Sequence, residues 1–427
     1  DVKIGMAVGG KNFRNFYPPE LGTMMGFDLG KLTPGGAGGE FYIAQQGALD
    51  AFRQIKDNGG NLTVPISRDF DIDQLIDATW YKVPWSDVLK NYKFINRVQI
   101  GLSAANNPTE VSLKNAIREA QAAGGSPSDN VITRYIKRVA DKLKEIGRTD
   151  IEIIIPMQGD DDVNYNASVG SYVFGNIFGP PASGASGYSA SEFTSLQPWV
   201  DGVMSAINTN LISTFPAVYF AATIYPFYYG IGIQPNSYAA LIYRAILSVD
   251  ALNKQYGFTK PKFLVSETGW PSYCNNGPSG AYPALSANRM KASPCKKCEM
   301  WTYFYNPGAT GADTQTTVFG ATQNIDMSRV SATPRYWWVL SGDGTHADCW
   351  TYPSPTPLGA AGNSKIWKQT GWSMITPWNQ AYGGKGGNFF CDFPLNNGNL
   401  VSGVGYAHDR PADAGPNAVA VNENANV

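Results

Sequence analysis

Short nonpolar segments alternate with amphipathic helical patterns along most of this 427-residue chain, and this alternation limits its fold more than any other feature. Strands that alternate with helices form parallel β-α-β units, and eight such units close into a barrel. We therefore predict an α/β chain in which residues 1–327 form a (β/α)8 TIM barrel. The eight candidate strands span residues 2–8, 41–43, 62–66, 97–102, 151–156, 217–225, 263–267 and 300–305.

Two of the helical patterns are long and well bounded. Residues 128–146 carry nonpolar side chains at the spacing of one helix face, with Ser128 or Asp129 as the expected cap and Gly147 as the stop. Residues 238–256 show the same periodicity directly before the candidate strand at 263–267. Both are expected to cover the outside of the barrel.

Residues 328–427 follow a different pattern, in which tryptophan and tyrosine lie among glycine, proline, asparagine and serine without a helical period. We predict that this segment is a C-terminal extension packed on the barrel or on a neighbouring subunit. Its last part, residues 411–427, is polar, and a polar terminus becomes ordered only against another surface. The extension is therefore the candidate interface for a homo-oligomer or filament.

Charge and histidine content exclude several classes of function. The 33 basic and 34 acidic residues give a net charge of −1, which offers no positive field to nucleic acid or acidic membranes. The two histidines, His346 and His408, are isolated, so a histidine-rich zinc site or a Ser-His-Asp triad is hard to build. The longest nonpolar stretch, residues 215–233, contains prolines and predicts a buried strand rather than a membrane span.

Cysteine use and glycosylation acceptors favour an exported protein. Cys295 and Cys298 have CxxC spacing, but a zinc site needs a second pair, so disulfides are expected instead and no metal site. An odd number of cysteines leaves one thiol free or paired with another chain. Asn61 and Asn166 begin glycosylation triplets, and the chain opens directly on a strand pattern. We expect a secreted, extracellular or cell-wall glycoprotein. The disulfide candidates are Cys274, Cys295, Cys298, Cys349 and Cys391.

The segment with the clearest chemical content is residues 263–272, in which Glu267 is followed by Thr268-Gly269-Trp270-Pro271. A carboxylate at the carboxyl end of a barrel strand points into the mouth where barrel active sites are built. An aromatic content of 13% also suits surfaces on which sugar rings stack. On these grounds Glu267 serves either catalysis or ligand binding.

Residues 266–272 resemble the signature of glycoside hydrolase family 17, the β-1,3-glucanases and related glucanosyltransferases. Residues 222–227 and the stretch from 166 to 190 are also similar to segments of that family. The resemblance implies that Glu267 is the catalytic nucleophile, that the partner is a β-glucan-like glycan and that no cofactor is needed. It adds four expected substrate-binding residues, Tyr225, Phe227, Trp270 and Tyr303.

The chain departs from the family at the acid. A retaining glycosidase needs a second carboxyl group about 5–5.5 Å from the nucleophile, and the family supplies it after the fourth strand. Ser103 occupies that position here. A serine cannot protonate a leaving sugar oxygen, and loss of general acid catalysis typically costs about 10²- to 10⁴-fold in rate. The carboxylates that could substitute for it are Asp69, Asp71, Glu110, Asp160, Asp161 and Asp162.

Three interpretations remain open at this point. The first is a family-17-like barrel with impaired catalysis that acts as a glycan-binding or structural extracellular protein. The second is an active β-1,3-glucan hydrolase or glucanosyltransferase, with Glu267 as nucleophile and one of the other carboxylates as acid. The third is a sugar-independent scaffold in which Glu267 forms a salt bridge.

Overall fold

The computed structural model describes the strands of the barrel, helices outside it and four small hairpins. These are residues 4–9, 29–33, 61–67, 75–77, 81–93, 95–102, 113–158, 163–166, 171–174, 190–224, 237–269, 300, 302–304, 306–308, 314–318, 321–337, 393–395 and 399–401.

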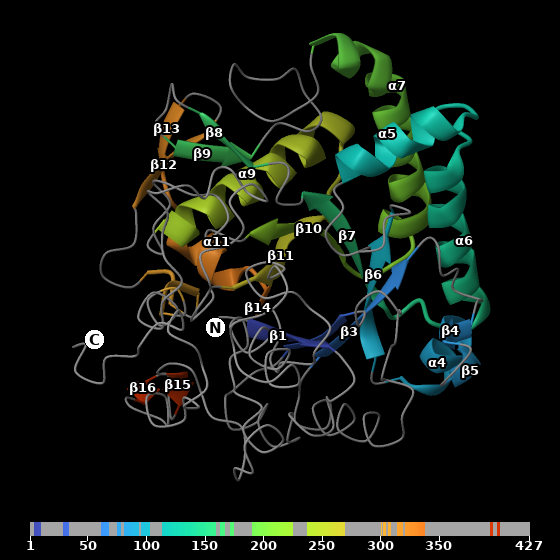
Figure 1. The fold of residues 1–427 in the computed structure, drawn as a ribbon, viewed down its shortest axis with the longest axis horizontal. Helices are drawn as coiled ribbons and strands as arrows, with labels where there is room; N and C mark the ends of the chain where they lie inside the picture. The colour runs from blue at the N-terminus through green and yellow to red at the C-terminus, as the bar shows by residue number, and fades with distance from the viewer. Residues whose placement is uncertain are drawn as a thin grey trace, which may run out of the picture.

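Eight parallel strands close into a barrel, as the alternation of strand and helix patterns predicted (Figure 1). Each strand pairs with the next barrel strand along the chain, and the last returns to pair with the first. The protein is therefore an α/β protein with a (β/α)8 barrel. In chain order the strands are β1 (Ile4–Gly9), β2 (Leu29–Thr33), β3 (Asn61–Ser67), β6 (Ile95–Gly101), β7 (Glu152–Gln158), β10 (Val218–Ile224), β11 (Lys262–Thr268) and β14 (Arg335–Trp337).

Helices lie outside the barrel, and α5, α6 and α7 pack side by side along one flank (Figure 1). The described helices are α4 (Trp85–Asn91), α5 (Leu113–Ala123), α6 (Val131–Glu145), α7 (Ala190–Ile207) with the π-helical turn η3 (Asn208–Ile212), α9 (Tyr238–Tyr256) and α11 (Met327–Ala332). The hairpins pair β4 (Leu75–Asp77) with β5 (Tyr81–Pro84), β8 (Val163–Asn166) with β9 (Ser171–Phe174), β12 (Gln315–Val318) with β13 (Ala321–Asn324) and β15 (Phe393–Leu395) with β16 (Asn399–Val401).

Helix α6 shows how local sequence sets a boundary. The side chain of Asn130, not that of Ser128 or Asp129 as predicted, caps it by accepting hydrogen bonds from two backbone N–H groups of the first turn. The Thr133 hydroxyl accepts a bond from the Asn130 N–H in return, which completes a capping box. The helix ends just before Gly147, whose φ of 71° suits the left-handed turn predicted there.

Two of the eight strands lie where the sequence did not predict them. The second strand is β2, at residues 29–33, whereas the predicted segment 41–43 lies outside the described residues. The eighth strand is β14, at residues 335–337, whereas the predicted segment 300–305 is helical at residues 302–304. Both true strands are short and lack a run of β-branched residues, and they are held by pairing with both neighbours. The barrel therefore continues past residue 327.

The buried side chain of Arg335 helps to hold β14 in place as the eighth barrel strand. The guanidinium of Arg335 is fully buried outside the sheet and donates to the carbonyls of Val330 at 2.6 Å, Phe304 at 3.0 Å and Thr333 at 3.2 Å. Burial lowers the pKa of Arg335 to about 10, which still leaves it charged at neutral pH. Charged donors make strong hydrogen bonds to carbonyls. Arg335 thus ties the end of α11 to the start of β14.

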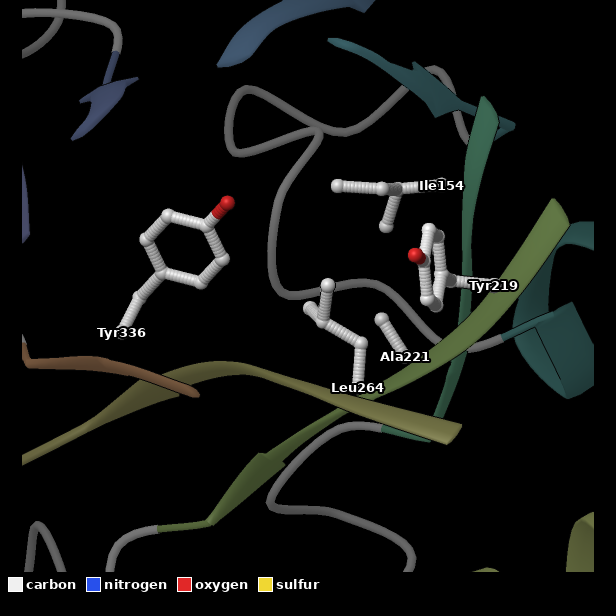
Figure 2. Packing of buried hydrophobic residues seen from close by; sticks show 5 residues of the cluster. All are labelled: Ile154, Tyr219, Ala221, Leu264 and Tyr336. Carbon is white, nitrogen blue, oxygen red and sulfur yellow. The ribbon is translucent and has the colours of Figure 1, made fainter. Parts of the chain in front are cut away.

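The barrel interior is filled by side chains that come from several strands. Figure 2 shows Ile154 from β7, Ala221 and Tyr219 from β10, Leu264 from β11 and Tyr336 from β14 pointing inward. Ile154, Ala221, Leu264 and Tyr336 are at most 1% exposed. The barrel is therefore a packed core whose ligand space, as in other barrels, is expected at its ends.

Candidate functional site

Glu267 lies at the carboxyl end of β11, the seventh barrel strand, and its side chain is fully buried. The alternation of side chains along a strand alone would turn it away from the barrel interior, because Leu264 faces inward and lies three positions earlier. The actual orientation of Glu267 therefore depends on how β11 pairs with its neighbours.

A β-bulge at Ser266 reverses the alternation. Val265 pairs with Ala222 on β10, but the next pair joins Glu267 to Thr223, so Ser266 has no opposite residue. Position 223 shares the inner face with Ala221, and paired positions on parallel strands share a face. The bulge thus places Glu267 inside the barrel. Bulges are common at barrel rims beside functional sites because they re-aim one side chain.

The pairing with β14 supports this assignment. Val265 pairs with Arg335 and Thr268 with Trp337, so β11 advances three residues while β14 advances two, and the extra residue of β11 lies between these pairs. Thr268 then faces outward, beside Tyr238 at the start of α9. Burial raises the pKa of Tyr238, and Arg335 and the Thr268 side chain oppose the shift. The seventh strand therefore presents Glu267, not Ser266, to the barrel interior.

A polar network lies in the barrel below Glu267. Arg97 on β6 is 2% exposed, forms an ion pair with Glu152 on β7 and donates to the Tyr336 hydroxyl at 3.2 Å. The Tyr336 hydroxyl also lies 3.0 Å from the Thr63 hydroxyl on β3, and the Arg97 guanidinium lies 5.2 Å from the ring centre of Tyr219. Burial lowers the pKa of Arg97, but Tyr336, Glu152 and Tyr219 together raise it above its ordinary value. The hydrogen bonds and the ion pair join four strands across the barrel, and the contact of Arg97 with Tyr219 adds a fifth.

Gln99 is a second inward-facing polar residue on β6, two positions after Arg97. Its side chain is fully buried, and neither its amide oxygen nor its amide nitrogen has a hydrogen-bond partner among the described residues. Sequence reasoning missed Gln99, Arg97 and Tyr336. One signal was available in the sequence: Arg97 and Gln99 lie two positions apart in a segment predicted as a barrel strand, so both side chains share one face of that strand.

The described barrel strands carry two carboxylates, Glu152 and Glu267. Glu152 is the first residue of β7, at the opposite end of the barrel from Glu267. At about 3.3 Å per residue, about 20 Å of strand separates it from Gln158 at the other end of β7. A retaining pair lies about 5–5.5 Å apart and an inverting pair about 6.5–9.5 Å, so Glu152 cannot act as the acid for Glu267.

Most of the other predicted site residues lie outside the described residues. Tyr303 is described and is 8% exposed, but it belongs to the helical residues 302–304 rather than to a barrel strand. The predicted contact of Tyr303 with a glycan assumed a strand at residues 300–305, which the structure does not have at residues 302–304. The contact itself stays a prediction. The residues outside the described part are Ser103, Tyr225, Phe227, Trp270, the five cysteines, Asp69, Asp71, Glu110, Asp160, Asp161 and Asp162.

The two predicted glycosylation acceptors lie in strands. Asn61 begins β3, and Asn166 ends β8. Thr63, the third residue of the first triplet, is fully buried and bonds to Tyr336, so this triplet is part of the barrel wall and not of a loop. Glycosylation at both positions stays a prediction.

Within the part of the chain that the structure describes, no group of histidine, cysteine or acidic side chains is placed to hold a metal ion. In the same residues, no helix combines the length and the nonpolar character needed to cross a membrane.

No protein family model matches this chain, and a search of curated proteins found no relative. Solved structures match at low similarity. An active-site mutant of the Rhizomucor miehei beta-1,3-glucanosyltransferase in complex with laminaritriose is 10% identical, with 79% of this chain and 86% of that one covered and a TM-score of 0.37.

The glycoside hydrolase family 17 beta-1,3-glucanosyltransferase from Rhizomucor miehei is 12% identical over 70% of this chain and 79% of that one, with a TM-score of 0.33. The endo-beta-1,4-mannanase from Thermotoga petrophila is 14% identical over 86% and 76%, with a TM-score of 0.37. At scores this low, the fold rests on the strand topology of this chain itself.

Proposed function

We propose that this protein is a glycan-binding barrel of the glycoside hydrolase type, in which Glu267 faces the sugar and hydrolysis is impaired. One observation carries the proposal: the bulge at Ser266 holds a buried carboxylate on the inner face at the carboxyl end of the seventh strand. Carboxylates are seldom fully buried, because burial of a charge is costly unless it is paired or hydrogen-bonded, so a buried carboxylate at this end of a barrel strand is a candidate functional group. The position is the one at which barrels build their sites.

A glycan is the ligand that the surrounding sequence supports best. Residues 266–272 resemble the signature of the β-1,3-glucan enzymes, and Trp270 comes two residues after the end of the bulged strand. An aromatic ring beside a carboxylate suits a sugar, which offers C–H groups for stacking and hydroxyls for hydrogen bonds. A β-1,3-glucan is therefore the first ligand to test.

Impaired hydrolysis follows from the missing acid. Ser103 stands where the resemblance requires a glutamate, and Glu152, the other carboxylate on the described strands, lies at the wrong end of the barrel. A site with the nucleophile alone is expected to be about 10²- to 10⁴-fold slower than a complete one.

The alternative is an active retaining hydrolase or glucanosyltransferase. It is favoured by the same bulge, because a site that had lost its reaction would not need a carboxylate aimed into the barrel. This alternative requires an acid from the predicted set at positions 69, 71, 110 or 160–162.

The deciding experiment measures laminarin binding by calorimetry and release of reducing ends in the same protein preparation. We expect binding without turnover, and weaker binding by Glu267→Gln. Asp87→Asn, on an exposed residue of α4, is the matched control and should behave like the wild type. Turnover that Glu267→Gln abolishes would replace the proposal with the active alternative. Neither binding nor turnover would refute both.

Ser103→Glu provides an independent test of the missing acid. If the site lacks only the general acid, this variant should hydrolyse laminarin at least about 100-fold faster than the wild type. An unchanged rate, with glucan binding retained, would show that the loss of hydrolysis has another cause.

We further propose that the protein acts outside the cell and that its C-terminal extension mediates self-association. The predicted export signals and the polar C-terminal end of the chain support both ideas. Light scattering of the full chain at high concentration tests the second, and a mass of 46.2 kDa apart from attached glycans would refute it.

A further inference from the structure

A hollow of about 340 Å³ lies at the amino-terminal end of the barrel, opposite the end that carries Glu267. It is bounded by the first residues of β11, the segment just before β14, and the facing sides of α9 and α11. All of its lining residues belong to the described part of the chain. Its volume falls in the range of small-molecule sites, which starts at about 300 Å³.

The rim of the hollow carries three charged groups. Arg329 on α11 donates to both carboxylate oxygens of Asp250 on α9, at 2.7 Å and 2.9 Å, so these two charges offset each other. The side chain of Lys262, the first residue of β11, has no ion pair or hydrogen bond among the described residues. With Lys262 and Arg329 positive and Asp250 negative, the lining carries a net charge of +1.

The Arg329–Asp250 pair fixes the guanidinium in place but does not use all of its donors. An arginine has five N–H donors in a planar fork, and a two-bond contact to one carboxylate leaves three of them. The hydrogen bonds to Asp250 also raise the pKa of Arg329. A fixed arginine and a lysine side chain without an ion pair, on the rim of one hollow, favour binding of a carboxylate or a phosphate.

The walls of the hollow are nonpolar. Val249 from α9, Phe263 from β11, Pro334 before β14 and Tyr219 from β10 line it. Tyr219 in turn lies against Arg97 of the interior network. The hollow therefore combines a cationic edge with an apolar body, and it shares Tyr219 with the interior of the barrel.

We propose that this hollow binds a small organic anion, with its acidic group at Lys262 and Arg329 and its nonpolar body against Val249 and Phe263. The site is independent of the glycan site, because it lies at the opposite end of the barrel and shares no residue with it. It would give the barrel a second ligand whose class, an aryl or alkyl carboxylate or phosphate, follows from the lining.

The test is calorimetric titration of the full chain with 2-naphthoate, and with 2-naphthamide as a neutral molecule of nearly the same shape. We expect 2-naphthoate to bind at least tenfold more tightly than 2-naphthamide. Lys262→Met should weaken naphthoate binding at least tenfold, and Ala332→Trp, which fills the hollow, should abolish it. Lys254→Met, on an exposed lysine of α9 that does not line the hollow, is the matched control.

Glu267→Gln should leave naphthoate binding unchanged, so failure of the glycan proposal and failure of this one are distinguishable. Competition with inorganic phosphate separates the contribution of the acidic group to binding from that of the nonpolar body. Because phosphate lacks the nonpolar body, it should displace naphthoate only at a concentration much higher than that of naphthoate itself. The proposal is overturned if naphthoate does not bind, if naphthamide binds equally well, or if Lys262→Met and Ala332→Trp bind naphthoate as the wild type does.

Discussion

Replacing only one member of the ion pair between Arg97 and Glu152 should leave the other charge without its partner. The two single replacements together should therefore destabilise the barrel far more than replacing both residues in one variant. The Arg97 side chain is 3% exposed and that of Glu152 is 29% exposed. Glu152→Leu leaves the Arg97 charge buried without its partner, whereas Arg97→Met leaves a carboxylate that can turn toward solvent. The double variant leaves neither charge in the barrel.

The magnitudes follow from these exposures. Removing one partner of a buried ion pair typically costs about 3–5 kcal/mol, and we expect Glu152→Leu in that range. Arg97→Met should cost about 2–4 kcal/mol, which includes about 1 kcal/mol for the lost hydrogen bond to Tyr336. Replacing both charges by nonpolar side chains is often nearly neutral, so the double variant should cost less than the sum by at least about 2 kcal/mol.

The assay is urea unfolding of the four proteins, followed by tryptophan fluorescence and far-UV circular dichroism together, because coincident curves are needed for a single free energy. The control cycle uses Lys137 and Asp141, an ion pair on α6 whose side chains are 66% and 48% exposed. Its coupling should stay near about 0.3–0.5 kcal/mol. Additive effects of Arg97→Met and Glu152→Leu, within about 0.5 kcal/mol, would refute the reasoning.

Three further changes test the local structure. Asn130→Ala removes the buried cap of α6 and should cost about 1–2 kcal/mol in urea unfolding; an effect below about 0.3 kcal/mol would contradict the capping role. Gly202→Ala places a Cβ against the carbonyl oxygen of Pro127, closer than van der Waals contact allows. It should cost about 1–3 kcal/mol although alanine favours helices, and a raised Tm would contradict the contact. The hydrogen bond from Arg148 holds the pKa of Asp150 below its usual 3.8. The stability that Asp150 provides is therefore present above pH 3.8 and is lost as the pH falls through the lowered pKa. Between pH 6 and pH 2 the Tm of the wild type should fall further than that of Asp150→Asn, and parallel decreases would refute this.

The elements predicted correctly are those in which the order of nonpolar and polar residues within the segment itself indicates which side chains are buried. β7 and β11 are nearly continuous nonpolar runs, since both of their faces are covered, and α9 spans the predicted residues 238–256. β2 and β14 lack such a pattern. Leu29–Thr33 and Arg335–Trp337 are strands because neighbours on both sides supply hydrogen bonds, and Arg335 is buried by carbonyls that lie up to 31 residues away.

The candidate site divides in the same way. Its central residue, Glu267, and its place at the end of the seventh strand could be predicted, because a carboxylate that ends a nonpolar run is a local feature. The network of Arg97, Glu152 and Tyr336 could not, because its members are 55 to 239 positions apart. Only closure of the barrel brings them together.

By itself, the sequence determined the fold class, most of the barrel strands and the position of the candidate site residue, Glu267, at the end of the seventh strand. The tertiary structure decided which strand closes the barrel and which way that residue points. These two kinds of information have different origins. The spacing of nonpolar residues within one segment indicates that the segment is buried, whereas the register between two strands depends on the residues of both strands. At Ser266 the register changes by one residue, and since side chains alternate between faces, that single step turns Glu267 from the outside of the barrel to its interior.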